Sequence, residues 1–151
     1  MEALDRAIVA KLAADGRMSF ADLGRQVGLS TSAVHQRVKR LEERGVITGY
    51  RAQVDYAAVG LPLTALISVV PFDPAADDDI PQRLAHIPQV VSCWSVAGDE
   101  NYVLLCRVPT PQDLESLIAE IREAGSCSTH TTVVLSTPWE GRIASVPVTD
   151  A

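Results

Sequence analysis

Apolar side chains recur every three or four residues in three stretches of the first third of the chain. The three sets are Leu4, Ile8 and Leu12; Phe20, Leu23 and Val27; and Val34, Val38 and Leu41. Such spacing is typical of amphipathic helices, each of which buries one face. Three short helices around one small core are therefore expected before residue 45.

Residues that favour helix ends separate these stretches. Ser19 followed by Asp22 resembles a capping box at the start of the second helix, and Ser30 can cap the third. Gly28 between them allows a left-handed turn. Gly24, inside the second helix, costs about 1 kcal/mol relative to Ala, and close helix packing is the expected compensation. Two helices joined by a short turn that contains Gly predict a helix-turn-helix.

Gly45 is expected to end the third helix, and a β-rich segment follows it. This segment, residues 46–52, has a central glycine and can form a short hairpin, the wing of a winged helix-turn-helix. All nine prolines lie after Gly60. We therefore expect a winged helix-turn-helix domain over residues 1–53, a linker over 54–60 and a second domain over 61–151.

The second domain alternates strand-like and helical patterns. The expected strands are Leu61–Val70, Val90–Val96, Tyr102–Val108 and Thr131–Leu135, and the expected helices lie around Ile80–Ile87 and Leu114–Ile121. The order β-α-β-β-α-β predicts a ferredoxin-like α/β sandwich with an antiparallel four-stranded sheet, and the whole chain is α+β. Two helices cover only one face of such a sheet, so we expect a homodimer through the other face, with Trp94 at an interface.

Charge and composition separate the two parts further. The net charge is −6, but residues 1–53 hold nine basic and six acidic residues, a net charge of +3, and residues 54–151 carry −9. This asymmetry is typical of a basic contact module joined to an acidic body. The longest apolar stretch, residues 61–72, is shorter than the roughly 20 residues of a membrane helix. Three cysteines suit a reducing compartment, so we expect a cytoplasmic protein with no membrane partner.

The third helix carries the candidate chemistry. Its outward face holds Ser32, His35, Gln36 and Lys39, with arginines on the flanks. Gln and His can hydrogen-bond base edges in the major groove, Arg and Lys neutralise phosphates, and the N-terminal turn suits a phosphate. The predicted DNA-binding residues are Ser30, Thr31, Ser32, His35, Gln36, Arg37, Lys39, Arg40 and Arg51. The alternative is a polar helix face that contacts only water.

Nothing in the sequence points to catalysis, a metal or a cofactor. The chain lacks a P-loop, a G-x-S-x-G elbow, an H-E-x-x-H pair and a dinucleotide fingerprint. A second hypothesis is a ligand-binding regulatory subunit of an enzyme or protein complex, whose N-terminal helices bind protein. A third is a hydrolase or oxidoreductase with an unfamiliar site.

Three segments carry a family resemblance over nearly the whole chain. They are LDRAIVAKLAADGRMSFADLGRQVGLSTSAVHQRVKRLEERGVITGYRAQVD, VAGDENYVLL and THTTVVLS. They resemble the Lrp/AsnC, or feast/famine, transcriptional regulators. The resemblance implies an N-terminal domain that binds double-stranded DNA at an imperfect palindrome. It also implies a C-terminal domain that dimerises, assembles dimers into tetramers or octamers, and binds a small effector, usually an amino acid.

The resemblance also implies the place of the effector site. The family commonly has Gly-Asp/Glu-x-Asp-Tyr between the second and third strands, and two threonines of the last strand match positions near the effector cleft. The implied residues are Gly98, Asp99, Glu100, Asn101, Tyr102, Thr131 and Thr132. Asn101 replaces the usual Asp, which removes one anionic group for an α-ammonium. On the residues alone, an ordinary hairpin turn is the favoured interpretation.

Overall fold

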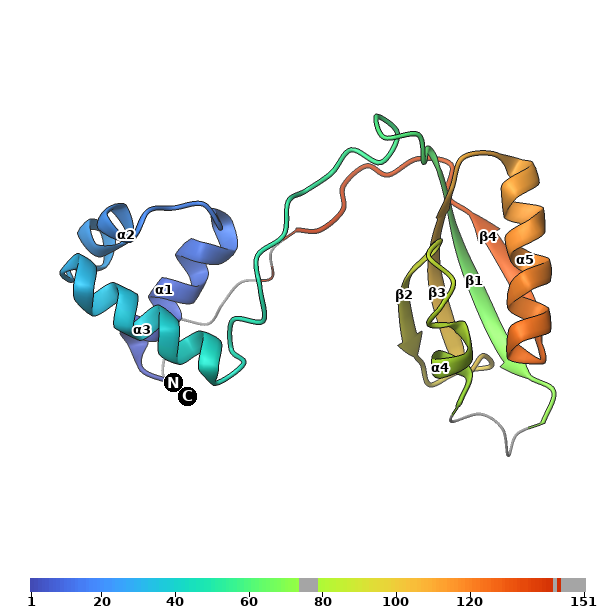
Figure 1. Cartoon of the computed structure of the whole chain (residues 1–151), viewed down its shortest axis with the longest axis horizontal. Coiled ribbons are helices and arrows are strands. Elements are labelled where there is room, and N and C mark those ends of the chain that lie inside the picture. Colours follow the sequence, from blue (N-terminus) through green and yellow to red (C-terminus); the bar gives the residue numbers. More distant parts are fainter. Residues whose placement is uncertain (74–78, 143, 145–151) are drawn as a thin grey trace. The chain divides into compact units, whose positions relative to one another are not determined.

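A computed structural model describes residues 1–73, 79–142 and 144 of the chain. It divides into two compact units, which we call the N-terminal unit, Met1–Gln53, and the C-terminal unit, Val54–Pro138; described residues from Trp139 onward group with the first. Figure 1 shows their elements. No helix among the described residues is long and apolar enough to cross a membrane. The predicted domains, residues 1–53 and 61–151 with a linker over 54–60, stay a prediction.

The N-terminal unit consists of the three expected helices. They are α1 (Ala3–Ala14), α2 (Phe20–Val27) and α3 (Thr31–Glu43). Their buried faces form one core of Ile8, Leu12, Leu23, Val34, Val38 and Leu41. Between α2 and α3, Gly28 adopts the predicted left-handed conformation at φ 72°. The apolar periodicity therefore predicted both the helices and their buried sides.

The predicted hairpin wing is wrong, because residues 46–52 contain no strand. The amide groups of Val46 and Ile47 both donate to the carbonyl oxygen of Leu41, at 2.9 and 3.2 Å. Ile47 packs against the helical core, and the Tyr50 hydroxyl donates to Glu42 at 3.0 Å. These contacts hold the segment along the helices, and its residues do not pair with one another as strands.

The C-terminal unit has the predicted β-α-β-β-α-β order. Its elements are β1 (Leu63–Pro71), α4 (Ile80–Leu84), β2 (Val90–Ser95), β3 (Tyr102–Val108), α5 (Pro111–Gly125) and β4 (Cys127–Val133). The four strands form one sheet in the order β2-β3-β1-β4, and every neighbouring pair is antiparallel. This is the expected ferredoxin-like sandwich.

The last strand begins four residues earlier than predicted and ends two residues earlier. Its register is set by β1, since Pro71 pairs with Cys127 and Ala65 with Val133. Ser, Thr and His dominate β4, so it lacks the apolar signal that marks the other strands. Strand pairing overrides this weak local preference.

The core of the C-terminal unit lies between the sheet and its two helices. Buried residues of β1, β3, β4, α4 and α5 form one cluster that includes Ile67, Leu104, Leu84 and Leu117, and Val90 of β2 packs against it while partly buried. Cys106 belongs to it, and burial raises the pKa of this thiol to about 12. The cysteine is therefore an inert core residue at neutral pH.

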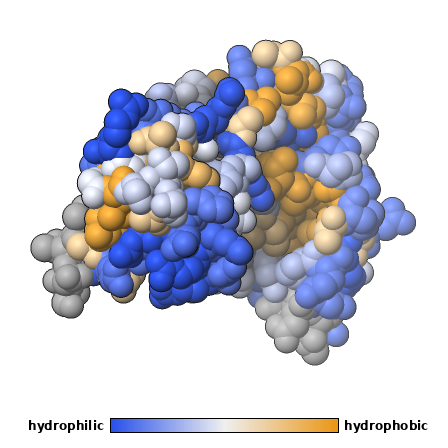
Figure 2. Space-filling view, turned by 60° about the vertical axis from the view of Figure 1, so that its left-hand side comes forward, coloured by the Kyte–Doolittle hydropathy of each residue, from blue (hydrophilic) through white to orange (hydrophobic). Residues whose placement is uncertain are grey.

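The other side of the sheet, here called the open face, carries the alternate residues of each strand. Leu66 and Val70 of β1 and Trp94 of β2 are 36%, 37% and 48% exposed there. Trp94 pairs with Val103 of β3, so both side chains lie on this face. In Figure 2, hydrophobic residues, coloured orange, form contiguous patches on the exposed surface.

The predicted linker ends in a structured turn. Asp55 accepts hydrogen bonds from the amides of Ala57 and Ala58 at 3.0 and 3.3 Å. The guanidinium of Arg107, on β3, lies 4.0 Å from the centre of the Tyr56 ring. Arg107 also donates to Thr64 at 3.1 Å. The linker turn therefore contacts the sheet through Tyr56.

Candidate nucleic-acid interface and effector site

Helix α3 separates its apolar and polar residues onto opposite sides. Val34, Val38 and Leu41 are at most 1% exposed and face the core. Ser32, His35 and Gln36 are exposed and share one side, since they are spaced by three and four residues. These three predicted base-reading side chains therefore point away from the unit together.

The N-terminus of α3 is capped as predicted. Ser30 accepts a hydrogen bond from the amide of Ala33 at 3.2 Å. The hydroxyl groups of Ser30 and Ser32 lie 3.2 Å apart, and Thr31 begins the helix with an exposed side chain. Hydroxyls and the first helical amide groups thus lie at one exposed end of α3, an arrangement that suits a phosphate group.

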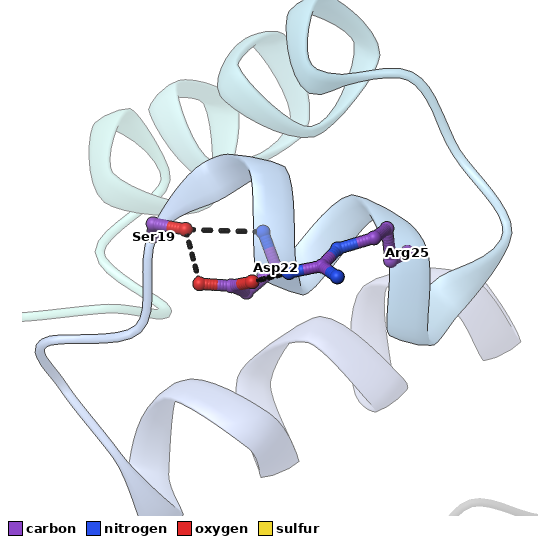
Figure 3. A network of polar contacts seen from close by, with 3 residues as sticks. All are labelled: Ser19, Asp22 and Arg25. Carbon is purple, nitrogen blue, oxygen red and sulfur yellow. Dashed lines mark hydrogen bonds and ion pairs between the residues drawn. The ribbon is translucent and has the colours of Figure 1, made fainter.

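Helix α2 begins with a network of three side chains (Figure 3). Ser19 accepts from the amide of Asp22 at 3.1 Å and donates to its carboxylate at 2.6 Å. Arg25 pairs with the same carboxylate. The capping box predicted the first two partners; the arginine at i+3 from Asp22 was missed, although that spacing is a usual one for an ion pair.

Aromatic packing joins α2 and α3. The rings of Phe20 and His35 have centroids 5.3 Å apart and are tilted by 57°. Phe20 is partly buried against the core. One side of the exposed imidazole is thereby fixed by α2.

The predicted phosphate-binding residues fall into two groups. Lys39, Arg40 and Arg51 are exposed, and Lys39 lies 3.8 Å from Glu43 in an exposed i,i+4 pair. Arg37 differs, because its Nη1 atom lies 2.8 Å from carboxylate oxygens of both Glu2 and Asp5 on the first helix and its cap. Hydrogen bonds to Glu2 and Asp5 raise the pKa of the Arg37 guanidinium.

The candidate effector loop joins β2 to β3 and is closed by backbone hydrogen bonds. The amide of Val96 donates to the carbonyl oxygen of Asn101 at 3.0 Å, and the amide of Asn101 donates to Val69 of β1 at 3.1 Å. Gly98 and Asp99 are exposed, whereas Glu100 and Asn101 are half-buried and Tyr102 is buried. A Cβ atom on Gly98 would lie 3.7 Å from the Glu100 carboxylate.

The two predicted threonines do not share a face. Thr131 pairs with the buried Ile67 and lies on the helix side, whereas Thr132 pairs with Leu66 and lies on the open face. Strand β1 separates β4 from β3, so the threonines and the loop are about two strand spacings, or roughly 10 Å, apart across the sheet. One chain therefore brings only part of the predicted effector set together.

The described residues also contain no group of three or more His, Cys, Asp or Glu side chains that could hold a metal ion.

Comparison with known families matches both units. Residues 1–42 match the model of the AsnC-type helix-turn-helix domain, and residues 64–144 match that of the Lrp/AsnC ligand-binding domain. The chain belongs to the Lrp/AsnC family. It is a helix-turn-helix transcriptional regulator, which confirms the resemblance of the sequence segments and the assignment of function.

Curated relatives of this Lrp/AsnC chain are similar over almost their whole length. The HTH-type transcriptional regulator LrpA of Mycobacterium tuberculosis is 46% identical over 142 residues, which cover 94% of this chain and 95% of the relative. The leucine-responsive regulatory protein of Haemophilus influenzae is 32% identical over 89% of this chain and 84% of its own.

A solved structure agrees with the fold. The feast or famine regulatory protein of Mycobacterium tuberculosis, complexed with L-methionine, is 46% identical, covers 95% of this chain and 97% of its own, and gives a TM-score of 0.92. The helix-turn-helix and the sandwich of this chain thus have the arrangement of elements found in its family.

Proposed function

We propose that α3 is the recognition helix of this regulator and enters the major groove of DNA. The observation that supports this most is the single exposed face that carries Ser32, His35 and Gln36 above a fully buried apolar face. Gln is suited to paired hydrogen bonds with adenine, while Ser and His can donate to or accept from base edges.

Backbone phosphates are bound by the surrounding groups in this proposal. Ser30 and Thr31 lie at the helix N-terminus, where free amide groups and a partial positive charge attract an anion. Lys39, Arg40 and Arg51 add exposed cations. Because cations release counterions from DNA, the affinity falls steeply as salt is raised.

Gln36→Ala tests the base-reading role. Loss of one bidentate contact costs about 1–3 kcal/mol of discrimination, so preference for the contacted base falls by about 5- to 150-fold. The measurement is competition between duplexes that differ at single base pairs, using a duplex that the wild-type chain selects from a random pool. Gln112→Ala, an exposed glutamine of the C-terminal unit, is the matched control and retains wild-type preference. An unchanged base preference in Gln36→Ala would overturn the assignment.

We infer that a second copy of the chain covers the open face of the sheet. Leu66 and Val70 of β1 and Trp94 of β2 expose apolar surface, and Val103 and Leu105 lie between them on β3. Packing this face removes that surface from water. A dimer presents two recognition helices, so its operator is an imperfect palindrome with half-sites about one helical turn apart. Assembly of dimers into tetramers or octamers would extend this arrangement.

We also infer that the effector is an amino acid bound at the Gly98–Tyr102 loop. Two facts support this: the match to the family's ligand-binding domain, and the L-methionine complex of a 46% identical relative. Asp99 and Glu100 offer carboxylates for the ammonium group, and backbone amides suit the carboxylate. Because Thr131 and Thr132 lie across β1 from this loop, a neighbouring copy would complete the site. The test is a change in duplex affinity upon addition of single amino acids.

A further inference from the structure

Arg37 is the one predicted phosphate-binding residue of α3 whose charged group contacts α1. Its Nη1 atom donates to Asp5 Oδ1 and to Glu2 Oε2, both at 2.8 Å. The side chains of Arg37 and Asp5 are 21% and 12% exposed, whereas that of Glu2 is 69% exposed. The contact with Asp5 is therefore the shielded half of this cluster.

The position of both partners on their helices explains this shielding. Arg37 follows Val34 by three residues and precedes Leu41 by four, so it borders the buried face of α3. Asp5 precedes Ile8 by three residues and borders the buried face of α1 in the same way. The ion pair thus bridges two helices directly beside their shared core.

Electrostatics at this position oppose a phosphate contact. A DNA phosphate would have to compete with two carboxylates that already share one guanidinium nitrogen. Those carboxylates also repel the phosphate. Arg40, three residues further along α3, is exposed.

We propose that Arg37 is a positioning residue: its ion pair with Asp5 fixes α3 against α1 and so orients Ser32, His35 and Gln36 for DNA. This inference rests on the proposed role of α3 as recognition helix. It reassigns Arg37 from phosphate binding, leaving Lys39 and Arg40 as the cationic side chains of this helix in that role. Rotation of α3 about its axis would turn all three base-reading side chains away together.

Asp5→Asn separates the two roles by the sign of its effect. If Arg37 contacts phosphate, removal of the competing negative charge frees the guanidinium and tightens DNA binding. If Arg37 positions α3, the same substitution weakens binding, and we expect a loss of about tenfold. The measurement is fluorescence anisotropy with a duplex that the wild-type chain selects, at a temperature where circular dichroism shows the variant fully folded.

The salt dependence of DNA affinity distinguishes the two roles of Arg37. Loss of a phosphate contact changes the slope of log K against log salt, whereas loss of a positioning contact does not. Arg37→Gln is expected to lower affinity while the slope of log K against log salt stays that of the wild type. Arg40→Gln, the matched control on the same helix, is expected to reduce the magnitude of that slope by about 0.9 for each bound subunit, the loss of one phosphate contact per subunit. Tighter binding by Asp5→Asn, or a slope reduced by about 0.9 per bound subunit in Arg37→Gln, would overturn the proposal.

Two further variants keep the test decisive if a single substitution unfolds the unit. Asp5→Glu keeps the carboxylate and is expected to restore most of the affinity that Asp5→Asn loses. The double variant Asp5→Asn/Arg37→Gln is expected to lose no more affinity than Arg37→Gln alone, because Asp5 acts through its contact with Arg37. Additive losses contradict the proposal. Failure of the wild-type chain to select any duplex would instead refute the role of α3 itself.

Discussion

Gly24 lies within α2 at a place where the backbone of the next segment leaves no room for a side chain. A Cβ atom on this residue would lie 2.6 Å from the carbonyl oxygen of Leu29, and the amide of Leu29 donates to the carbonyl of Gly24 at 2.9 Å. The sequence indicated close packing here, because a helical glycine otherwise only costs stability. The structure identifies the turn that enters α3 as the neighbour.

Gly24→Ala is therefore expected to destabilise the chain despite the better helix propensity of alanine. Overpacking against a rigid backbone costs about 1–3 kcal/mol. The gain in helix propensity from Gly to Ala is about 1 kcal/mol, so the net loss of stability is at most about 2 kcal/mol. The measurement is the free energy of unfolding from urea titration. Gly16→Ala is the control, since its nearest neighbour would be a Tyr50 ring carbon at an ordinary 3.5 Å. A Gly24→Ala variant more stable than the wild type would contradict this reading.

Local chemistry and long-range contacts differ in how well the sequence revealed them. The caps at Ser19 and Ser30 involve partners three residues away, so spacing alone predicted them. The partner of Arg37 lies 32 residues away on another helix. In the sequence, only the position of Asp5 beside the apolar stripe of α1 indicated this ion pair. An acidic residue at such a position is compatible with many other partners. Arg37 therefore looked like one more exposed cation.

At the scale of elements, hydrophobic periodicity predicted each helix and three of the four strands closely. The two departures have one cause, which is that pairing and packing partners outweigh local preference. The β-rich segment 46–52 lies on the helical core instead of forming a hairpin, since two strands alone are only marginally stable. The polar strand β4 exists because β1 offers it a ladder of hydrogen bonds.

The turn within the predicted linker contacts the sheet through the ring of Tyr56, which lies against Arg107, so Tyr56→Ala is expected to loosen it. Loss of a cation–π contact worth about 0.5–2 kcal/mol raises local opening by about 2- to 30-fold. The measurement is hydrogen exchange of the amides of Ala57, Gly60 and Leu61, which bond within this turn. Tyr56→Phe keeps the ring over Arg107 and is expected to exchange like the wild type. Unchanged exchange in Tyr56→Ala would show that the ring does not anchor the turn.

At the scale of the whole molecule, the split of charge and the uncovered sheet face were both visible in the sequence. A helix-turn-helix could be derived from stripes, caps and one turn glycine, and the sandwich from the order of its elements. The effector site could not be assembled in this way. Its loop and threonines lie on strands separated by β1, and in our proposal a neighbouring copy completes the site, which no periodicity along a single chain encodes.

We propose that this Lrp/AsnC chain binds specific DNA and that an amino acid changes its affinity. The most direct measurement selects duplexes from a random pool with the full chain, then titrates the enriched duplex with and without each of the twenty amino acids, with mass followed by light scattering. We predict an enriched imperfect palindrome and at least one amino acid that changes both its Kd and the assembly mass. Failure to enrich a sequence would refute specific DNA binding, and a Kd and mass unaffected by all twenty would refute an amino-acid effector.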